Sequence, residues 1–124
     1  MDPSLSVGLL YETRFTHYNQ GMQHRHEAAT RTWSKTLFND VHFLRVATAI
    51  GQGPAETDAT VLQADLKLTQ PAVRRVIVDL EGVRLLDRLD RVSRTEPQRY
   101  RRAEGHPFWA AASALLNAAI EVER

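Results

Sequence analysis

The side chains with the clearest chemical capacity in this sequence are arginines, and they are concentrated in one part of the chain. Between Arg74 and Arg102 lie nine arginines and five acidic residues, whereas the whole chain has a net charge of only +1. A guanidinium group stays charged and binds planar anions through paired hydrogen bonds, which suits phosphate groups and the edge of guanine. The distribution favours a polyanionic partner, and the alternative is a solvated surface whose charges pair with one another.

Few residues suit catalysis or metal binding. The chain has no cysteine, and His24 and His26 are the only histidines close together, whereas zinc usually takes four regularly spaced ligands. The sequence contains no glycine-rich phosphate loop, nucleophile elbow or His-Glu metal motif, and its carboxylates are scattered singly among arginines. We therefore expect that the protein is not an enzyme and has neither a cofactor nor a metal site.

A pair of short helices within residues 58–86 is predicted to position two of the arginines. Asp58 or Thr60 can cap the first helix, because their side chains accept hydrogen bonds from the free N–H groups of a first turn. We expect this helix to end near Lys67 and to bury three apolar residues, Val61, Leu62 and Leu66. Leu68 would then fill the corner before the second helix.

The second helix begins with residues typical of a helix start. Thr69 can cap it, and Pro71 lies in its first turn, where a missing N–H group costs nothing. Apolar residues at steps of three and four predict a buried face made of Val73, Val76, Ile77 and Leu80. The opposite face then presents Gln70, Arg74, Arg75 and Val78. A helix with such a face is suited to the major groove of duplex DNA.

The flanking residues predict further helices and a β-hairpin. Residues 22–38 are typical of a helix with an apolar face of Ala28, Trp33, Leu37 and Phe38. Asn39 or Asp40 can cap a helix over residues 41–50, although residues 22–50 could also be one bent helix. A brief strand is expected near Glu56 and Thr57. Two strands, 85–92 and 98–103, are expected to form a two-stranded hairpin through a turn at 93–97.

The C-terminal residues are typical of an amphipathic helix from Phe108 to about Val122. Its apolar side comprises Phe108, Trp109, Ala112, Leu115, Leu116, Ala119 and Ile120. Because a three-helix core leaves little surface to cover this side, we expect these residues to form a homodimer interface. The alternative is that the helix packs on its own domain.

The middle of the chain resembles winged helix-turn-helix regulators, in particular the ArsR-like and MarR-like bacterial repressors. The matching residues are LTQPAVRR at 68–75, then Leu80-Glu81 and Leu85-Leu86, and the resemblance covers about residues 37–104. It implies a mainly α fold with a small β-hairpin wing, to which this chain adds an N-terminal helical extension and a C-terminal amphipathic helix. Two features depart from the family: Arg84 stands where the family usually has a glycine, and the N-terminal extension is longer than in a minimal member.

The resemblance also implies which residues would contact double-stranded DNA. They are Thr69, Gln70, Ala72, Arg74, Arg75 and Val78 in the recognition helix, and Arg91, Arg94 and Arg99 in the wing. Free N–H groups at the helix start favour phosphate, arginines read base edges, and small apolar residues allow close approach. The alternative for Arg74 or Arg75 is an ion pair with Asp79 or Glu81 on the helix surface.

We therefore expect three segments: an N-terminal extension at 1–38, a winged helix-turn-helix domain at 39–104 and a dimerisation helix at 105–124. The expected protein is a cytoplasmic, homodimeric transcriptional regulator of bacterial type that binds specific duplex DNA, most simply as a repressor. No apolar run is long enough to cross a bilayer, and nothing identifies a small-molecule effector. The alternatives are a winged-helix protein–protein adapter and a phage or plasmid DNA-maintenance protein.

Overall fold

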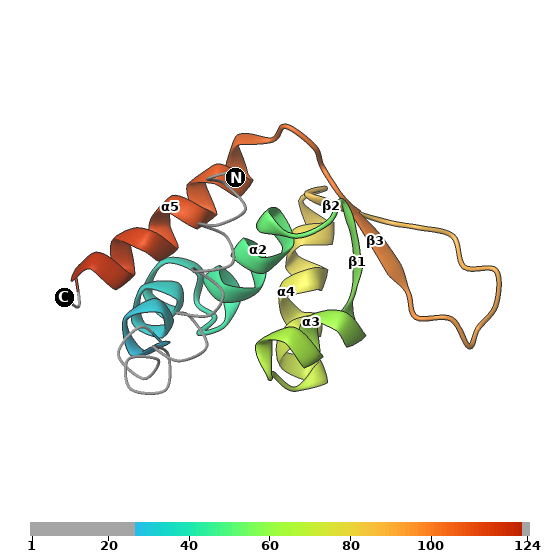
Figure 1. Cartoon of the computed structure of the whole chain (residues 1–124), viewed down its shortest axis with the longest axis horizontal. Coiled ribbons are helices and arrows are strands. Elements are labelled where there is room, and N and C mark those ends of the chain that lie inside the picture. Colours follow the sequence, from blue (N-terminus) through green and yellow to red (C-terminus); the bar gives the residue numbers. More distant parts are fainter. Residues whose placement is uncertain (1–26, 123–124) are drawn as a thin grey trace, which may run out of the picture.

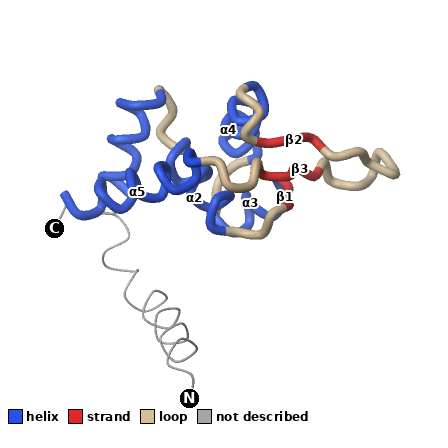
Figure 2. The backbone as a smooth tube through the Cα atoms, turned by 90° about the horizontal axis from the view of Figure 1, so that it is seen from above, coloured by secondary structure: helices blue, strands red, loops and turns tan. Residues whose placement is uncertain are grey.

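The computed structural model describes residues 27–122, which are mainly helical with one small antiparallel sheet (Figures 1 and 2). A helix over residues 27–38 is followed by α2 (Phe43–Gln52), α3 (Ala59–Leu66), α4 (Gln70–Gly82) and α5 (Pro107–Val122). The strands are β1 (Glu56–Asp58), β2 (Leu86–Arg88) and β3 (Arg99–Arg102). Within residues 27–122, no helix combines the length and the apolar character that a membrane span requires. Predictions about residues 1–26 lie outside the described residues.

The residues before α3 form two helices rather than one bent helix. Asn39 has a left-handed backbone (φ +58°), which ends the helix 27–38. The prediction that Asn39 or Asp40 is the N-cap of α2 is wrong, because His42 has that position and makes no side-chain capping bond. The Asp40 Oδ1 atom instead accepts a hydrogen bond from the His42 N–H at 2.9 Å. Asp40 therefore stabilises the turn that leads into α2.

The helix 27–38 packs through a smaller and more polar side than its sequence predicts. Ser34 is fully buried; its hydroxyl donates to the Asp40 carbonyl and accepts from the Leu44 N–H at 3.0 Å. Leu37, assigned to the apolar face, is 54% exposed, so that assignment is wrong. A buried N–H group without an acceptor is costly, and the Ser34 hydroxyl supplies the acceptor for the Leu44 N–H in the first turn of α2. This hydrogen bond explains why the helix packs through its Ser34 side.

The two helices predicted within residues 58–86 are confirmed, together with their caps. The Asp58 carboxylate accepts from the Val61 N–H at 2.9 Å, and the Thr69 hydroxyl accepts from the Ala72 N–H at 3.4 Å. In α4 all four predicted core residues are at most 1% exposed: Val73, Val76, Ile77 and Leu80. In α3 only Leu62 is fully buried, and the prediction for Val61 is wrong because it is 48% exposed. Successive side chains of a helix point about 100° apart. Since Leu62 points into the core, its neighbour Val61 points away from it.

The sheet has one strand more than the predicted hairpin. Strands β2 and β3 pair antiparallel, and β1 pairs with the other edge of β3, giving the order β1-β3-β2. Tyr100 lies opposite both Thr57 and Arg88 and is buried against the helices. The brief strand expected at Glu56 and Thr57 is therefore confirmed, and it belongs to the same sheet as the hairpin. The strands are shorter than predicted, and residues 89–98 form a long loop that projects from the body of the molecule (Figure 1).

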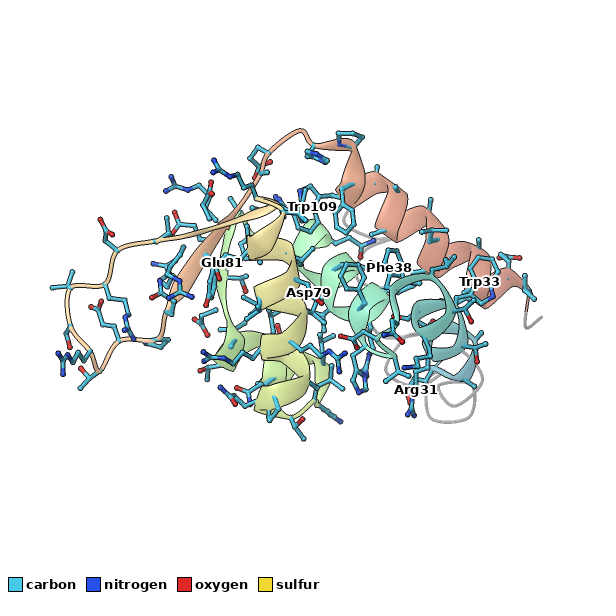
Figure 3. The ribbon with its side chains drawn as sticks, turned by 180° about the vertical axis from the view of Figure 1, so that it is seen from behind. Arg31, Trp33, Phe38, Asp79, Glu81 and Trp109 are labelled. Atoms are coloured by element: carbon cyan, nitrogen blue, oxygen red, sulfur yellow. The ribbon has the colours of Figure 1, made fainter. Side chains whose placement is uncertain are left out.

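Helix α5 packs along α2 of the same chain. Trp109, Ala112 and Ala119 are buried, and the Trp109 indole donates to the Ala103 carbonyl at 2.9 Å. Figure 3 shows Trp109 at the start of α5. A Cβ atom at Gly51 of α2 would lie 3.2 Å from the Trp109 Cβ, so glycine permits this close approach. The expectation that the chain itself cannot cover the apolar side of α5 is therefore wrong for these three residues. Phe108, Leu115, Leu116 and Ile120 remain partly exposed.

Candidate nucleic-acid interface

The predicted DNA-contacting face of α4 is open to solvent. Because Val73 and Val76 are buried in the core, the residues between and beside them turn outward. Five of the six predicted contacts in this region are exposed and Ala72 is half-buried; the five are Thr69, Gln70, Arg74, Arg75 and Val78. The structure therefore brings these six residues together on one side of α4 and at its N-terminus.

The two arginines of α4 are not neutralised by acids on their own helix. Glu81 instead pairs with Arg88 of β2, whose Nε atom lies 3.0 Å from Glu81 Oε2. This hydrogen bond, with the charge of Glu81, raises the pKa of the Arg88 guanidinium. Among the described residues Arg74 makes no hydrogen bond or ion pair, and Arg75 has one distant partner, Asp40, at 3.9 Å. The alternative pairing with Asp79 or Glu81 is therefore wrong.

Two of the three arginines predicted to contact DNA from the hairpin lie in its loop, residues 89–98. Arg91 and Arg94 are exposed and make no ion pair with any residue in the described part of the chain. Arg99 in β3 differs, because its Nη2 atom lies 3.1 Å from Glu56 Oε1. Arg101 binds the other oxygen of the same carboxylate at 2.9 Å. The hairpin loop therefore presents two guanidinium groups that are unpaired among the described residues, whereas Arg99 and Arg101 of β3 share one carboxylate.

Glu56 is the acid that pairs with two arginines of β3, Arg99 and Arg101. The hydrogen bond from Arg101, together with the charges of Arg99 and Arg101, holds the pKa of the Glu56 carboxyl below its ordinary value. Since β1 pairs with β3 in the register Glu56 to Arg101, the two arginines flank Glu56 on one face of the sheet. The sequence did not indicate this pairing, because strand β1 is separated from β3 by two helices.

Hydrogen bonds within the hairpin loop support its shape. The Val92 N–H donates to Glu96 Oε2 at 3.1 Å, and the Thr95 N–H donates to Ser93 Oγ at 3.0 Å. The Gln98 side chain donates to the Leu89 carbonyl across the base of the loop. These bonds hold Arg91 and Arg94 on a turn that is partly ordered before any partner binds.

The exit from α4 explains how Arg84 replaces the expected glycine. Arg84 has a left-handed backbone (φ +64°), a conformation that glycine adopts more easily than other residues. Its N–H donates to the Glu81 carbonyl at 3.0 Å, and the Leu85 N–H donates to the Leu80 carbonyl at 2.9 Å. Both bonds belong to the Schellman ending of a helix. The chain therefore turns into β2 in the usual way, with the strain of one non-glycine residue.

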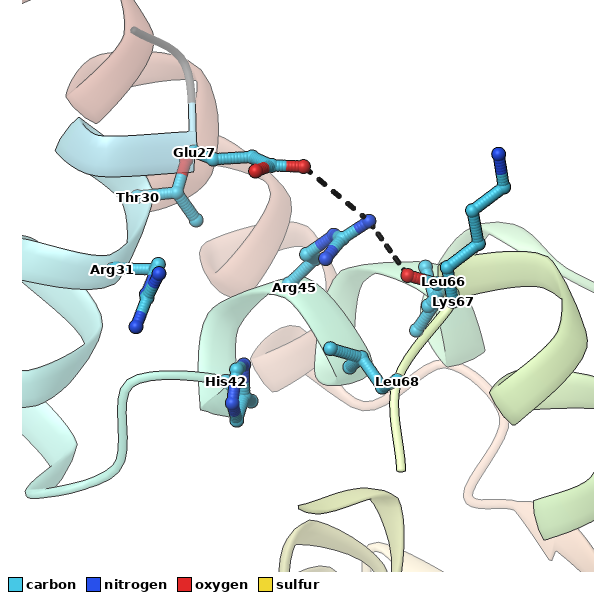
Figure 4. A pocket seen from close by; sticks show the side chains of 8 residues that line it. All are labelled: Glu27, Thr30, Arg31, His42, Arg45, Leu66, Lys67 and Leu68. Atoms are coloured by element: carbon cyan, nitrogen blue, oxygen red, sulfur yellow. Dashed lines mark hydrogen bonds and ion pairs between the residues drawn. The ribbon is translucent and has the colours of Figure 1, made fainter. Parts of the chain in front are cut away.

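A second group of basic side chains lies next to the N-terminal end of α4. Arg31, His42, Arg45 and Lys67 line a pocket of about 260 Å³ between the helix 27–38, α2 and the α3–α4 corner (Figure 4). Arg45 donates to the Leu66 carbonyl at 2.8 Å and lies 3.8 Å from Glu27. Burial lowers the pKa of His42 and is opposed by Asp40, while Arg31 and Arg45 lower it further. The sequence analysis missed this group, because its members come from separate helices.

Candidate metal ligands are not gathered together in the part of the chain that the structure describes. Residues 27–122 contain no group of three histidine, cysteine or carboxylate side chains that could hold an ion. His24 and His26, the pair considered from the sequence, lie outside the described residues.

Comparisons with protein-family models, with curated proteins and with solved structures found no match to this chain. The function therefore has to be inferred from the geometry and the charge of its own residues.

Proposed function

We propose that this protein is a winged helix-turn-helix regulator that binds specific sequences of duplex DNA. The observation that carries the proposal is the face of α4, where Arg74 and Arg75 are exposed and neither pairs with an acid on its own helix. In this proposal α3 and α4 are the helix-turn-helix, and the β2–β3 hairpin is the wing. The order of the elements and the resemblance of residues 68–75 to such regulators support the assignment.

Helix α4 would enter the major groove of B-DNA, which is about 12 Å wide and accepts one helix. Arginine reads guanine through two hydrogen bonds to O6 and N7, at roughly 1–3 kcal/mol of discrimination per pair. Thr69 and Gln70 would lie near a phosphate at the helix start, while Ala72 and Val78 would permit close approach to bases. Arg91 and Arg94 would contact the DNA backbone or the minor groove, and Arg99 would contribute less because Glu56 already pairs with it.

The protein would act as a homodimer, most simply a repressor. The four partly exposed apolar residues of α5 are the proposed contact between subunits: Phe108, Leu115, Leu116 and Ile120. Because Trp109, Ala112 and Ala119 are buried within the chain, they would support the interface from beneath rather than form it. A twofold dimer would place two α4 helices about one DNA turn apart, which predicts a palindromic site.

The direct test is selection of bound fragments from random duplex DNA, followed by affinity measurements on the selected sequence. The double variant Arg74→Ala/Arg75→Ala should lose the preference for that sequence and remain folded, because both side chains are exposed. The control Arg88→Ala/Arg101→Ala removes the same charge from the sheet, where each arginine is already paired with an acid. This control should keep the preference for the selected sequence. Wild-type affinity in the α4 double variant would refute the proposal.

A second candidate is a winged-helix adapter that binds another protein. Exposed apolar residues favour it, since Val78 and Val83 at α4 and Val92 in the hairpin loop are 50%, 67% and 92% exposed. Salt distinguishes the two functions. DNA binding should weaken steeply as salt is raised because counterions are released, whereas an apolar protein contact should not weaken in this way.

A further inference from the structure

Asp40 is a buried carboxylate with an unsatisfied oxygen. Its side chain is only 7% exposed, in the turn between the helix 27–38 and α2. One oxygen, Oδ1, accepts the His42 N–H at 2.9 Å, whereas Oδ2 is buried and accepts no hydrogen bond from any described residue. A buried carboxylate oxygen without a hydrogen-bond donor is costly. A nearby cationic donor would therefore stabilise Asp40.

The candidate donor is Arg75 of α4. The Arg75 Nε atom lies 3.9 Å from Asp40 Oδ2, and the arginine side chain is 66% exposed. This distance is too long for a hydrogen bond, and a movement of roughly 1 Å would bring the pair to hydrogen-bonding range. Lys35, which lines the same cavity of about 340 Å³, already donates to Asn39 Oδ1 at 3.0 Å. Arg75 is therefore the cation best placed to satisfy Asp40.

The Arg75 nitrogen nearest to Asp40 is Nε, and this determines which N–H groups stay available for another acceptor. A guanidinium group donates through Nε and through two Nη atoms. Docking through Nε leaves the far end of the guanidinium free, where one N–H of each Nη atom can donate side by side to a planar acceptor. The edge of guanine, with O6 and N7, is such an acceptor. Arg74 has no comparable partner among the described residues, so only Arg75 would be fixed in this way.

We propose that Asp40 is a positioning residue that orders the guanidinium of Arg75 for bidentate contact with a guanine base. This inference rests on the proposed DNA-binding function and adds a specificity determinant that does not itself touch DNA. A long, exposed arginine loses side-chain freedom on binding, and an arginine held by a buried carboxylate loses less. Asp40 precedes Arg75 by 35 residues and belongs to a different element.

Simple electrostatics and the positioning role predict different results for Asp40→Asn, because the first acts on affinity for any duplex and the second on the preference for one sequence. Asparagine keeps the size of the side chain and an oxygen for the His42 N–H, but removes the charge that attracts Arg75. Less negative charge near DNA should strengthen binding, whereas loss of positioning should reduce the preference for the selected sequence over a scrambled duplex by about tenfold. The control Asp79→Asn removes one charge from an exposed residue of α4 and should keep the preference. An unchanged or increased preference in Asp40→Asn would overturn the proposal.

A double-mutant cycle tests whether the effect passes through Arg75. Adding Asp40→Asn to Arg75→Ala should cause no further loss of preference, because the residue to be positioned is already absent. An equal loss in both backgrounds would assign Asp40 a purely structural role.

If Asp40→Asn fails to fold, hydrogen exchange at the arginine Nε–H groups in the wild-type complex with DNA provides the test. The Arg75 Nε–H should exchange about tenfold more slowly than the Arg74 Nε–H when Asp40 accepts it, and equal rates would overturn the proposal. Failure of the proposed function gives a different result, because the wild-type protein would then prefer no duplex over its scrambled form. The positioning role of Asp40 would be refuted together with the proposed function in that case.

Discussion

Arg102 holds the C-terminal end of α2 through the carbonyl of Ile50, at 2.7 Å from its Nη1 atom. The same nitrogen lies 2.8 Å from the Gly53 carbonyl oxygen, and the Arg102 side chain is only 14% exposed. The last carbonyls of a helix have no partner within the helix and carry its negative dipole end. An arginine from β3 therefore joins the sheet to α2, although the sequence analysis counted it with the DNA-binding charge.

Replacement of Arg102 should destabilise the fold. Arg102→Leu leaves the carbonyls of Gly51 and Gly53 at the α2 end without their arginine donor, which should lower the free energy of unfolding by about 2–3 kcal/mol. Urea unfolding at neutral pH measures this loss. Arg101→Leu is the matched control, since its side chain is 57% exposed and should change stability by less than about 0.5 kcal/mol. Equal stability of the two variants would show that the contacts of Arg102 are not structural.

Replacement of Arg84 by glycine should stabilise the protein. The left-handed backbone of Arg84 (φ +64°) is strained for any residue with a Cβ atom, so Arg84→Gly should raise the free energy of unfolding by about 1 kcal/mol. The urea midpoint should rise while the slope of the transition stays unchanged. Arg84→Ala removes the charged side chain but keeps the Cβ atom, and it should show no such gain. A gain of similar size in both variants would attribute the effect to the charge.

His42 should make stability depend on pH. Because burial lowers the pKa of His42 in the folded protein, the unfolded chain binds this proton more tightly. The contribution of neutral His42 is therefore present above its ordinary pKa of 6.5 and decreases as the pH falls through that value. Unfolding free energies between about pH 8 and pH 5 should fall less steeply for His42→Gln than for the wild type. If the unfolding free energies of the two proteins fell in parallel with pH, His42 would not be the source of the pH dependence.

Local patterns in the sequence predicted the elements well, because helix caps and apolar spacing act over a few residues. Asp58, Thr69 and the buried face of α4 are of this kind. Contacts between distant segments were not predictable, because nothing local to β1 indicates that it pairs with β3. The same applies to the site. The exposed face of α4 follows from helical periodicity, whereas the approach of Asp40 to Arg75 depends on how two helices pack.

The proposed homodimer can be tested at the partly exposed apolar side of α5. Leu115→Glu/Ile120→Glu places two charges in the proposed interface, where burial without a partner is costly, so the dimer should dissociate. Sedimentation equilibrium should then give the mass of one chain, 14.1 kDa. Asn117→Glu/Ala118→Glu adds the same charge at exposed positions of α5 and should leave the dimer intact. A dimeric Leu115→Glu/Ile120→Glu variant would exclude this interface, because a dimer formed there would have to bury two added carboxylates, which is costly.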